Sequence, residues 1–219
     1  MIENWRADFK NPELAFHFVQ LAPWQAVAKK PGESTWAELR EAQTMTLSKL
    51  KNVGMAAITD LGDEGDIHPV PKKPVGDRLA LIARALNYGE KIVYSGPMYK
   101  SVKFDADKAV LSFDHPGSGL VAKEIVPTPS ARKGAKNAFA WRVKEGATSA
   151  PLVGFTLCGE DKVFHEAKAE IVGDTVVVSS AQVKTPIAVR YGWANHPICN
   201  LYNREGLPAS PFRTDAFPG

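Results

Sequence analysis

An apolar run followed by a polar loop and an amphipathic segment constrains the fold most strongly. Residues 53–60 are typical of a strand that is buried on both faces of a sheet. Residues 75–88 repeat apolar side chains at helical spacing, with Pro74 in the first turn and Gly89 as the stop. We expect Arg78 on the wetter face of this helix. The order of strand, loop and helix predicts an α/β unit, in which ligands bind beyond the carboxyl ends of the strands.

The loop between these two elements contains the motif Asp66-Ile67-His68-Pro69. In extended backbone, residues i and i+2 project to the same side, so the Asp66 carboxylate can accept the Nδ1–H of His68. Such a bond fixes the imidazole tautomer and stabilises the imidazolium when the ring takes a proton from a hydroxyl. A motif this short also fits an ordinary surface turn with an exposed histidine. Asp66 and His68 are therefore candidate catalytic residues, two thirds of a catalytic triad.

The serine that would complete such a triad has no recognisable setting in this sequence. Gly117-Ser118-Gly119 follows a proline in an expected hairpin, and its spacing is not that of a nucleophile elbow. The other serines fit helix caps, turns or surface positions. We therefore expect a hydrolase of which this sequence holds only part of the machinery.

The pattern of elements divides the chain into two regions. Residues 1–91 are predicted to be α/β, with a strand at 16–21 and a helix at 35–51 that Ser34 or Thr35 caps.

The second region, residues 92–219, is predicted to be mostly β. Short strands at regular spacing between turns are typical of a β-sandwich, and Gly173-Asp174 fits a two-residue hairpin turn. Residues 123–149 are rich in Lys, Pro, Gly and Ala, with few large apolar side chains. We interpret them as a long mobile insertion.

Composition limits the classes of function. Hydrophobic residues make up 44% of the 219 residues and charged ones 23%, as in ordinary folded proteins. The net charge of +3 is spread along the chain, which argues against a nucleic-acid partner. No run is long and apolar enough to span a membrane, and the N-terminus lacks the pattern of a signal peptide.

The cysteines and the remaining histidines suggest no metal or cofactor. Cys158 and Cys199 fit either one disulfide or two separate buried thiols, and neither has the partners of a zinc site. We predict no metal and no cofactor. The histidines without a carboxylate neighbour in sequence are His17, His115, His165 and His196.

Four segments resemble the C-terminal part of the sialate O-acetylesterases, also called sialic acid-specific 9-O-acetylesterases, within the SGNH/GDSL hydrolase superfamily. They cover nearly the whole chain, which makes the resemblance far more specific than a three-residue motif. The segments are residues 5–6 with 16–24, residues 36–43, residues 57–80, and residues 188–194 with 200–203 and 206–215.

The resemblance implies an esterase that removes O-acetyl groups from sugars through an acyl-enzyme. His68 would be the general base and acid, and Asp66 the carboxylate that orients it. The family's nucleophile lies in a segment of the type Gln-Gly-Glu-Ser-Asn, upstream of the residues matched here, as do most oxyanion-hole donors. The implied partners are an acetylated sugar and either a complementary N-terminal chain that carries the nucleophile or further copies in a homo-oligomer. The implied location is periplasmic or secreted.

The resemblance also implies a fold. Residues 1–91 would be the C-terminal part of a three-layer SGNH-type α/β domain, and residues 92–219 a β-sandwich whose tail folds back toward it. Residues 190–218 combine aromatic rings with amide and guanidinium groups, which suits either a sugar-binding rim or packing of the sandwich, with Arg213 and Asp215 as a surface ion pair. Two alternative functions stay open: an acetylxylan esterase, and a glycan-binding module in which Asp66 and His68 are inert.

Overall fold

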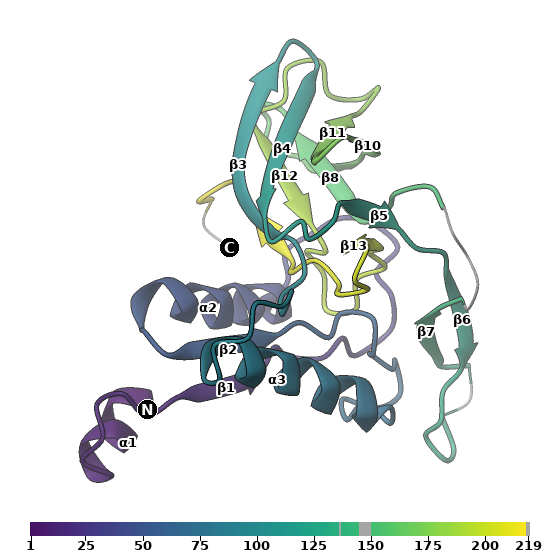
Figure 1. Ribbon diagram of the computed structural model, residues 1–219. Helices are drawn as coiled ribbons and strands as arrows, with labels where there is room; N and C mark the ends of the chain where they lie inside the picture. The colour runs from purple at the N-terminus through teal and green to yellow at the C-terminus, as the bar shows by residue number, and fades with distance from the viewer. Residues whose placement is uncertain (136, 145–149, 218–219) are drawn as a thin grey trace.

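The computed structural model describes residues 1–135, 137–144 and 150–217. Within these residues the chain is mostly β-sheet with three helices, so the mixed α/β class is confirmed (Figure 1). The helices are α1 (Ile2–Asp8), α2 (Thr35–Lys49) and α3 (Lys72–Leu86). The strands are β1 (Phe16–Val19), β2 (Val53–Ala56), β3 (Met98–Asp105), β4 (Lys108–Asp114), β5 (Leu120–Ala122), β6 (Ile125–Pro129), β7 (Phe139–Val143), β8 (Phe155–Cys158), β9 (His165–Glu166), β10 (Lys168–Val172), β11 (Thr175–Ser179), β12 (Ala188–Tyr191), β13 (Leu201–Asn203) and β14 (Phe212–Arg213).

The three helices and the first two strands form an α/β part around a parallel pair of strands. β1 and β2 pair in parallel, and all four residues of β2 are buried, as its apolar sequence predicts. A Cβ on Gly54 would collide with Ile82 of α3, whereas the next residue, Met55, contacts Thr44 of α2. Because successive residues of a strand face opposite sides, α3 and α2 cover opposite faces of the pair.

Local signals in the sequence set the ends of α2 and α3. Ser34 caps α2, since its side chain accepts a hydrogen bond of 3.0 Å from the backbone N–H of Ala37. α3 begins at Lys72, three residues before the predicted start, and still has Pro74 in its first turn. Gly89 follows the helix with a positive φ of 71°, which glycine adopts without strain.

One charged residue of α3 lies where the sequence analysis did not place it. Arg78 is buried rather than on the wetter face, and it holds Asp60 through two hydrogen bonds of 2.7 and 2.6 Å. β2 ends at Ala56, so the following residues leave the sheet and bring Asp60 under the helix. The ion pair with Asp60 offsets the free-energy cost of removing the Arg78 guanidinium from water.

The β-rich part, β3 to β14, has two four-stranded sheets that share one core. Their strand orders are β10-β11-β4-β3 and β14-β12-β8-β9. The predicted turn at Gly173 joins β10 to β11. Side chains from both sheets alternate into the core, and the buried residues include Leu111, Phe113, Phe155, Leu157, Val176, Val178, Val189, Tyr191 and Phe212.

The segment interpreted as a mobile insertion is a β-hairpin for much of its length. β6 pairs with β7 over five residues, from Ile125 opposite Val143 to Pro129 opposite Phe139. Prolines in β6 weakened the strand pattern, but an edge strand tolerates them. Figure 1 shows this hairpin descending from the β-rich part beside the α/β part. Residues 136 and 145–149 of the segment lie outside the described residues.

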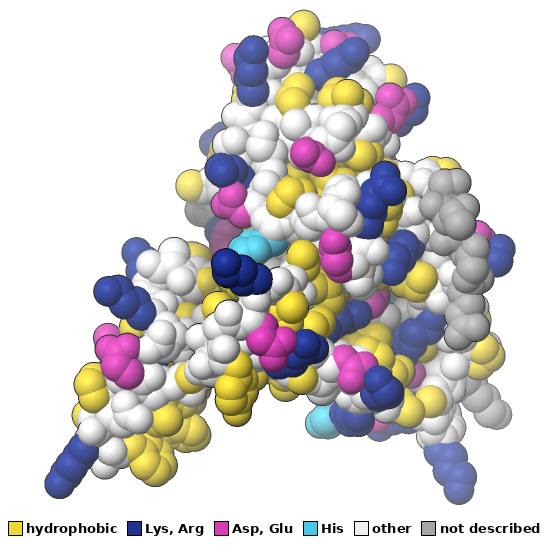
Figure 2. All heavy atoms as spheres, viewed as in Figure 1, with side chains coloured by type: hydrophobic (Ala, Val, Ile, Leu, Met, Phe, Trp, Pro, Cys, Tyr) yellow, Lys and Arg dark blue, Asp and Glu magenta, His cyan; other side chains and the backbone are white. Residues whose placement is uncertain are grey.

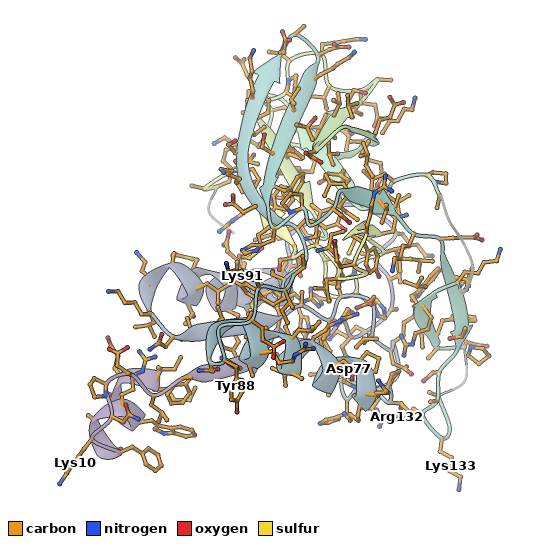
Figure 3. All side chains as sticks on the ribbon, viewed as in Figure 1. Lys10, Asp77, Tyr88, Lys91, Arg132 and Lys133 are labelled. Carbon is orange, nitrogen blue, oxygen red and sulfur yellow. The ribbon has the colours of Figure 1, made fainter. Side chains whose placement is uncertain are left out.

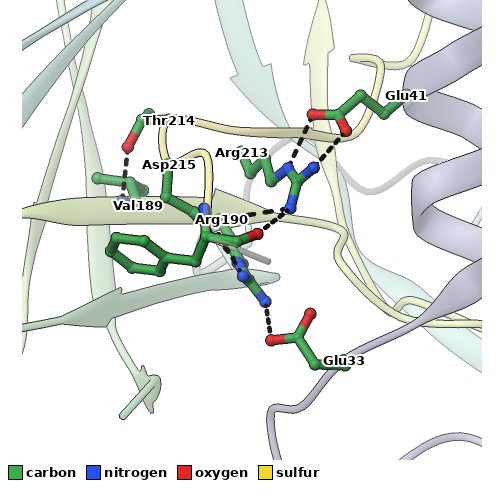
Figure 4. A network of polar contacts seen from close by, with 8 residues as sticks. Glu33, Glu41, Val189, Arg190, Arg213, Thr214 and Asp215 are labelled. Carbon is green, nitrogen blue, oxygen red and sulfur yellow. Dashed lines mark hydrogen bonds and ion pairs between the residues drawn. The ribbon is translucent and has the colours of Figure 1, made fainter. Parts of the chain in front are cut away.

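Buried arginines connect the α/β part to the β-rich part. Arg40 of α2 is fully buried and donates to the carbonyl oxygens of Leu21, Ala194 and Asn195 at 2.7–2.8 Å. Burial lowers the pKa of Arg40 to about 10. A second connection is the network in Figure 4, which includes Arg190 of β12 and Glu33 in the loop before α2.

The network in Figure 4 also corrects one alternative for the tail. Arg213 and Asp215 do pair, at 3.9 Å, but the Asp215 side chain is fully buried and its closer partner is Arg190 at 3.0 Å, so the pair is not on the surface. Arg213 also holds Glu41 of α2 at 2.8 Å. The tail therefore contacts the α/β part through two ion pairs: Arg213–Glu41, which is partly buried, and Arg190–Glu33, whose carboxylate side chain is half-exposed.

Two expectations from composition can be compared with the described residues. Among them, Cys158 and Cys199 are both buried free thiols, and burial raises the pKa of each to about 11. None of the helices described is long and apolar enough to cross a membrane.

Candidate active site

Asp66 and His68 lie in the loop between β2 and α3 and contact each other. The Oδ1 atom of Asp66 accepts the backbone N–H of His68 at 2.9 Å and lies 3.0 Å from Nδ1 of the ring. Both contacts come from one short turn, in which an aspartate side chain bonds the backbone two residues later. The His68 side chain is 81% exposed and that of Asp66 33%, so a second molecule can reach the ring.

The hydrogen bonds of this turn keep Asp66 ionised. The backbone N–H of His68 lowers the pKa of the Asp66 carboxyl most, followed by its ring and then by the charges of His68 and Arg132. An ionised carboxylate only accepts hydrogen bonds, so the contact at 3.0 Å places the ring proton on Nδ1. The Nε2 atom of His68 is then unprotonated in the neutral ring and suited to take a proton.

Two serines of the described residues, Ser130 and Ser118, contact carboxylates other than Asp66. Ser130 donates its hydroxyl to Asp63 at 2.6 Å, and the backbone N–H of Ser118 donates to Glu205 at 3.0 Å. Among the hydrogen bonds of the described residues, the His68 ring has Asp66 as its partner and no serine.

The residues just before Asp66 form contacts that the sequence analysis missed. Asp63 is 1% exposed, and Glu64 accepts the indole N–H of Trp141 at 3.2 Å. Both are held by the β6–β7 hairpin, which sequence analysis took for a mobile segment. The alternation of Phe139, Ala140 and Trp141 was the available signal for β7.

The aromatic tail mostly packs inside the molecule. Trp193 is 8% exposed, and its ring lies 5.2 Å from the Arg190 guanidinium and 4.8 Å from that of Arg213. A cavity of about 400 Å³ is lined mainly by residues from 26–34 and 192–198. Neither Asp66 nor His68 is among its lining residues. These contacts favour the packing interpretation of Trp193 over a sugar-binding rim above His68.

The described residues offer no obvious metal centre, since they contain no group of three His, Cys, Asp or Glu side chains that could hold an ion. His196 is buried, and its Nδ1 lies 3.1 Å from the carbonyl oxygen of Gln25. Burial lowers its pKa, which favours the neutral ring.

Comparison with known proteins shows that the chain is similar to esterases. No protein-family model matches the chain. Human sialate O-acetylesterase is 27% identical over 248 aligned residues, covering 100% of this chain and 42% of the human protein. Mouse sialate O-acetylesterase is 28% identical, covering 97% of this chain and 39% of the mouse protein. The resemblance to the sialate O-acetylesterases is confirmed.

A solved structure agrees with this assignment. A carbohydrate acetylesterase from Xanthomonas citri is 43% identical, with a TM-score of 0.81, and the match covers 99% of this chain and 45% of that one. The chain therefore spans less than half the length of the sialate O-acetylesterases and of the Xanthomonas enzyme that it matches.

Proposed function

We propose that this chain is part of a carbohydrate O-acetylesterase and supplies its general base. The observation that carries the proposal is the hydrogen-bonded pair of Asp66 and His68, with an exposed ring, in the loop between β2 and α3. The similarity to enzymes named as sialate and carbohydrate acetylesterases supports the same chemistry.

In the proposed mechanism, a serine outside this chain attacks the acetyl carbonyl while Nε2 of His68 takes its proton. His68 then gives that proton to the departing sugar alkoxide, which leaves an acetyl-serine. The ring next takes a proton from water, and the resulting hydroxide attacks the acetyl group; the bond to the serine oxygen breaks, acetate is freed, and the ring returns its proton to the serine. Asp66 holds the ring and stabilises its charged form in both halves of the reaction.

The incomplete sheet supports a role for a complementary polypeptide. Within the described residues, β1 and β2 pair only with each other, although helices cover both faces. We propose that residues 1–91 form one half of a three-layer SGNH-type domain whose remaining strands extend this sheet, followed by a β-sandwich domain at 92–219. Figure 2 shows hydrophobic side chains gathered over α1, where Trp5 and Phe9 are 50% and 69% exposed. Either a complementary chain or another copy of this one would cover such a surface.

The test combines this chain with the part of the Xanthomonas citri acetylesterase that it does not match, produced as a separate polypeptide. We expect negligible hydrolysis of p-nitrophenyl acetate by either polypeptide alone and hydrolysis by the mixture. Activity of this chain alone that survives His68→Ala would contradict the assigned base.

The same mixture discriminates between substrates. We expect it to release acetate from O-acetylated sialic acid faster than from acetylated xylan. The reverse preference would indicate an acetylxylan esterase. Glycan binding by this chain without hydrolysis in any mixture would indicate a binding module instead.

A further inference from the structure

We infer that the β6–β7 hairpin is a positioning element for the loop that carries Asp66 and His68. The inference deepens the proposed function, on which it rests. The hairpin lies some 70 residues further along the chain and bonds four consecutive residues, 62–65, immediately before Asp66.

Asp63 makes the most buried of these contacts. Its Oδ1 accepts the hydroxyl of Ser130 at 2.6 Å and the backbone N–H of Gly65 at 2.8 Å. Its Oδ2 accepts the backbone N–H of Ala131 at 3.2 Å. Its backbone carbonyl accepts the N–H of Asp66 at 3.3 Å, which connects this buried carboxylate to the catalytic pair.

Glu64 extends the pairing of β7 into the loop. Its backbone N–H donates to the carbonyl of Phe139 at 3.0 Å, and its Oε2 accepts the N–H of Phe139 at 3.1 Å. Its Oε1 accepts the indole N–H of Trp141 at 3.2 Å. Glu64 is thus held at its backbone and at both carboxylate oxygens.

Arginines and close packing hold the two glycines of the loop. Arg142 donates to the carbonyl of Gly62, and Arg132 donates to that of Gly65 at 2.6 Å. A Cβ on Gly65 would lie 2.8 Å from the Cβ of Ala135 and 2.9 Å from the Ser130 hydroxyl, so the hairpin turn fits against this glycine. Figure 3 shows Arg132 at the hairpin turn on the side of α3, while Lys133 points away.

The catalytic pair needs such support because it has little packing of its own. The His68 side chain is 81% exposed, so apolar contacts cannot fix its position. A general base must stay within hydrogen-bond reach of the proton that it takes, and small displacements lower the rate steeply. The hairpin supplies rigidity through contacts on one side of the loop and leaves the ring open to a substrate.

The test removes one hairpin contact at a time and observes His68 directly. In Trp141→Phe the ring stays and the N–H to Glu64 is lost, whereas Ser130→Ala removes the hydroxyl bound to Asp63. Lys144→Ala is the matched control, because it breaks the exposed Lys144–Glu124 pair of the same hairpin without touching the loop. Nitrogen NMR of the neutral, 15N-labelled imidazole measures the fraction of the Nδ1–H tautomer.

In Trp141→Phe and Ser130→Ala we expect this fraction to fall toward that of free histidine, and the His68 amide proton to exchange roughly tenfold faster. Ser130→Thr, which keeps the hydroxyl, should restore both values, and Lys144→Ala should leave them unchanged. Unchanged signals in both test variants would overturn the inference. So would loss of the whole fold in both, which would make the hairpin a structural element only. Neither readout needs a nucleophile or substrate, so failure here leaves the esterase proposal to its own assay.

Discussion

At the residue scale, the hydrogen bonds of the loop lower the pKa of the Asp66 carboxyl. Its main hydrogen bond comes from the backbone N–H of His68 and the next from the ring of the same residue. Both partners lie two residues away, which is why a local motif was enough to predict the contact. Arg78 shows the opposite case, since its partner Asp60 is 18 residues away and the helical pattern gave no sign of it.

The two contacts of Asp66 can be separated by titration. Because its pKa is lowered, the carboxylate should stay ionised at a pH where ordinary aspartates take up a proton, and its bonds to His68 should be lost only as the pH falls further. In His68→Ala we expect the pKa of Asp66 to rise only partway, since the backbone N–H remains. Carbon NMR of the labelled carboxyl measures both values. A pKa that does not move in His68→Ala would show that the ring contact is absent in solution.

Acid sensitivity is expected from His196. Burial lowers the pKa of this ring in the folded chain, so the unfolded chain takes up the proton first as the pH falls. Its contribution to stability is therefore full above the ordinary histidine pKa and lost as the pH falls through the folded value. His196→Asn should reduce the drop in the free energy of unfolding between neutral and mildly acidic pH, as measured by urea titration. His17 is half-buried and its pKa is also lowered by burial, so part of the drop should persist.

At the scale of elements, β2 and α3 pack closely together, and this contact holds the two ends of the loop that connects them. Gly54 allows this contact, because a Cβ there would collide with Ile82. Gly76 lies on the exposed side of α3 with no atom near its Cβ position.

These two glycines form a matched pair for mutation. Gly54→Ala should lower the free energy of unfolding by about 1–3 kcal/mol, because the core must shift. Gly76→Ala should raise it by up to about 1 kcal/mol, because alanine favours the helix. Chemical denaturation of both variants measures the difference. Equal effects at the two positions would contradict the packing of α3 on β2.

Elements defined by local signals were predicted well, and those defined by distant contacts were not. The cap at Ser34, the helix after Pro74 and the hairpin at Gly173 all follow from residues close in sequence. The β6–β7 hairpin gains its order from contacts with residues 62–65, so composition alone suggested a mobile segment. The contacts that hold the loop of Asp66 and His68 were therefore not predicted, although the alternation at residues 139–141 indicated β7.

At the scale of the whole molecule, a network of ion pairs around the buried Arg190–Asp215 pair connects the tail to the α/β part. Arg190 and Asp215 exclude water from a shared contact, and Glu33 and Glu41 carry the network across to the loop before α2 and to α2 itself (Figure 4). We expect the tail to stabilise the fold through this network. The Trp193 ring packs against the guanidinium groups of Arg190 and Arg213.

Removing one partner of the buried pair should be far more damaging than breaking a surface pair. Asp215→Ala leaves Arg190 without its buried carboxylate and should cost about 3–5 kcal/mol of unfolding free energy. Asp77→Ala breaks the exposed Lys73–Asp77 pair of α3 and should cost less than about 1 kcal/mol. Thermal unfolding of the two variants measures the contrast. A loss in Asp215→Ala no larger than that in Asp77→Ala would show that the network does not stabilise the fold.

The central claim is the proposal that His68 acts as the base of an acetylesterase whose serine lies outside these 219 residues. The most direct test is kcat/KM for an O-acetylated sugar, measured in the mixture of this chain with the unmatched part of the Xanthomonas enzyme. His165 on β9 provides the control histidine. We expect His68→Ala to lower kcat/KM by about 10²–10⁴-fold and His165→Ala to leave it nearly unchanged. A His68→Ala mixture that keeps the activity of the unaltered one would contradict the account.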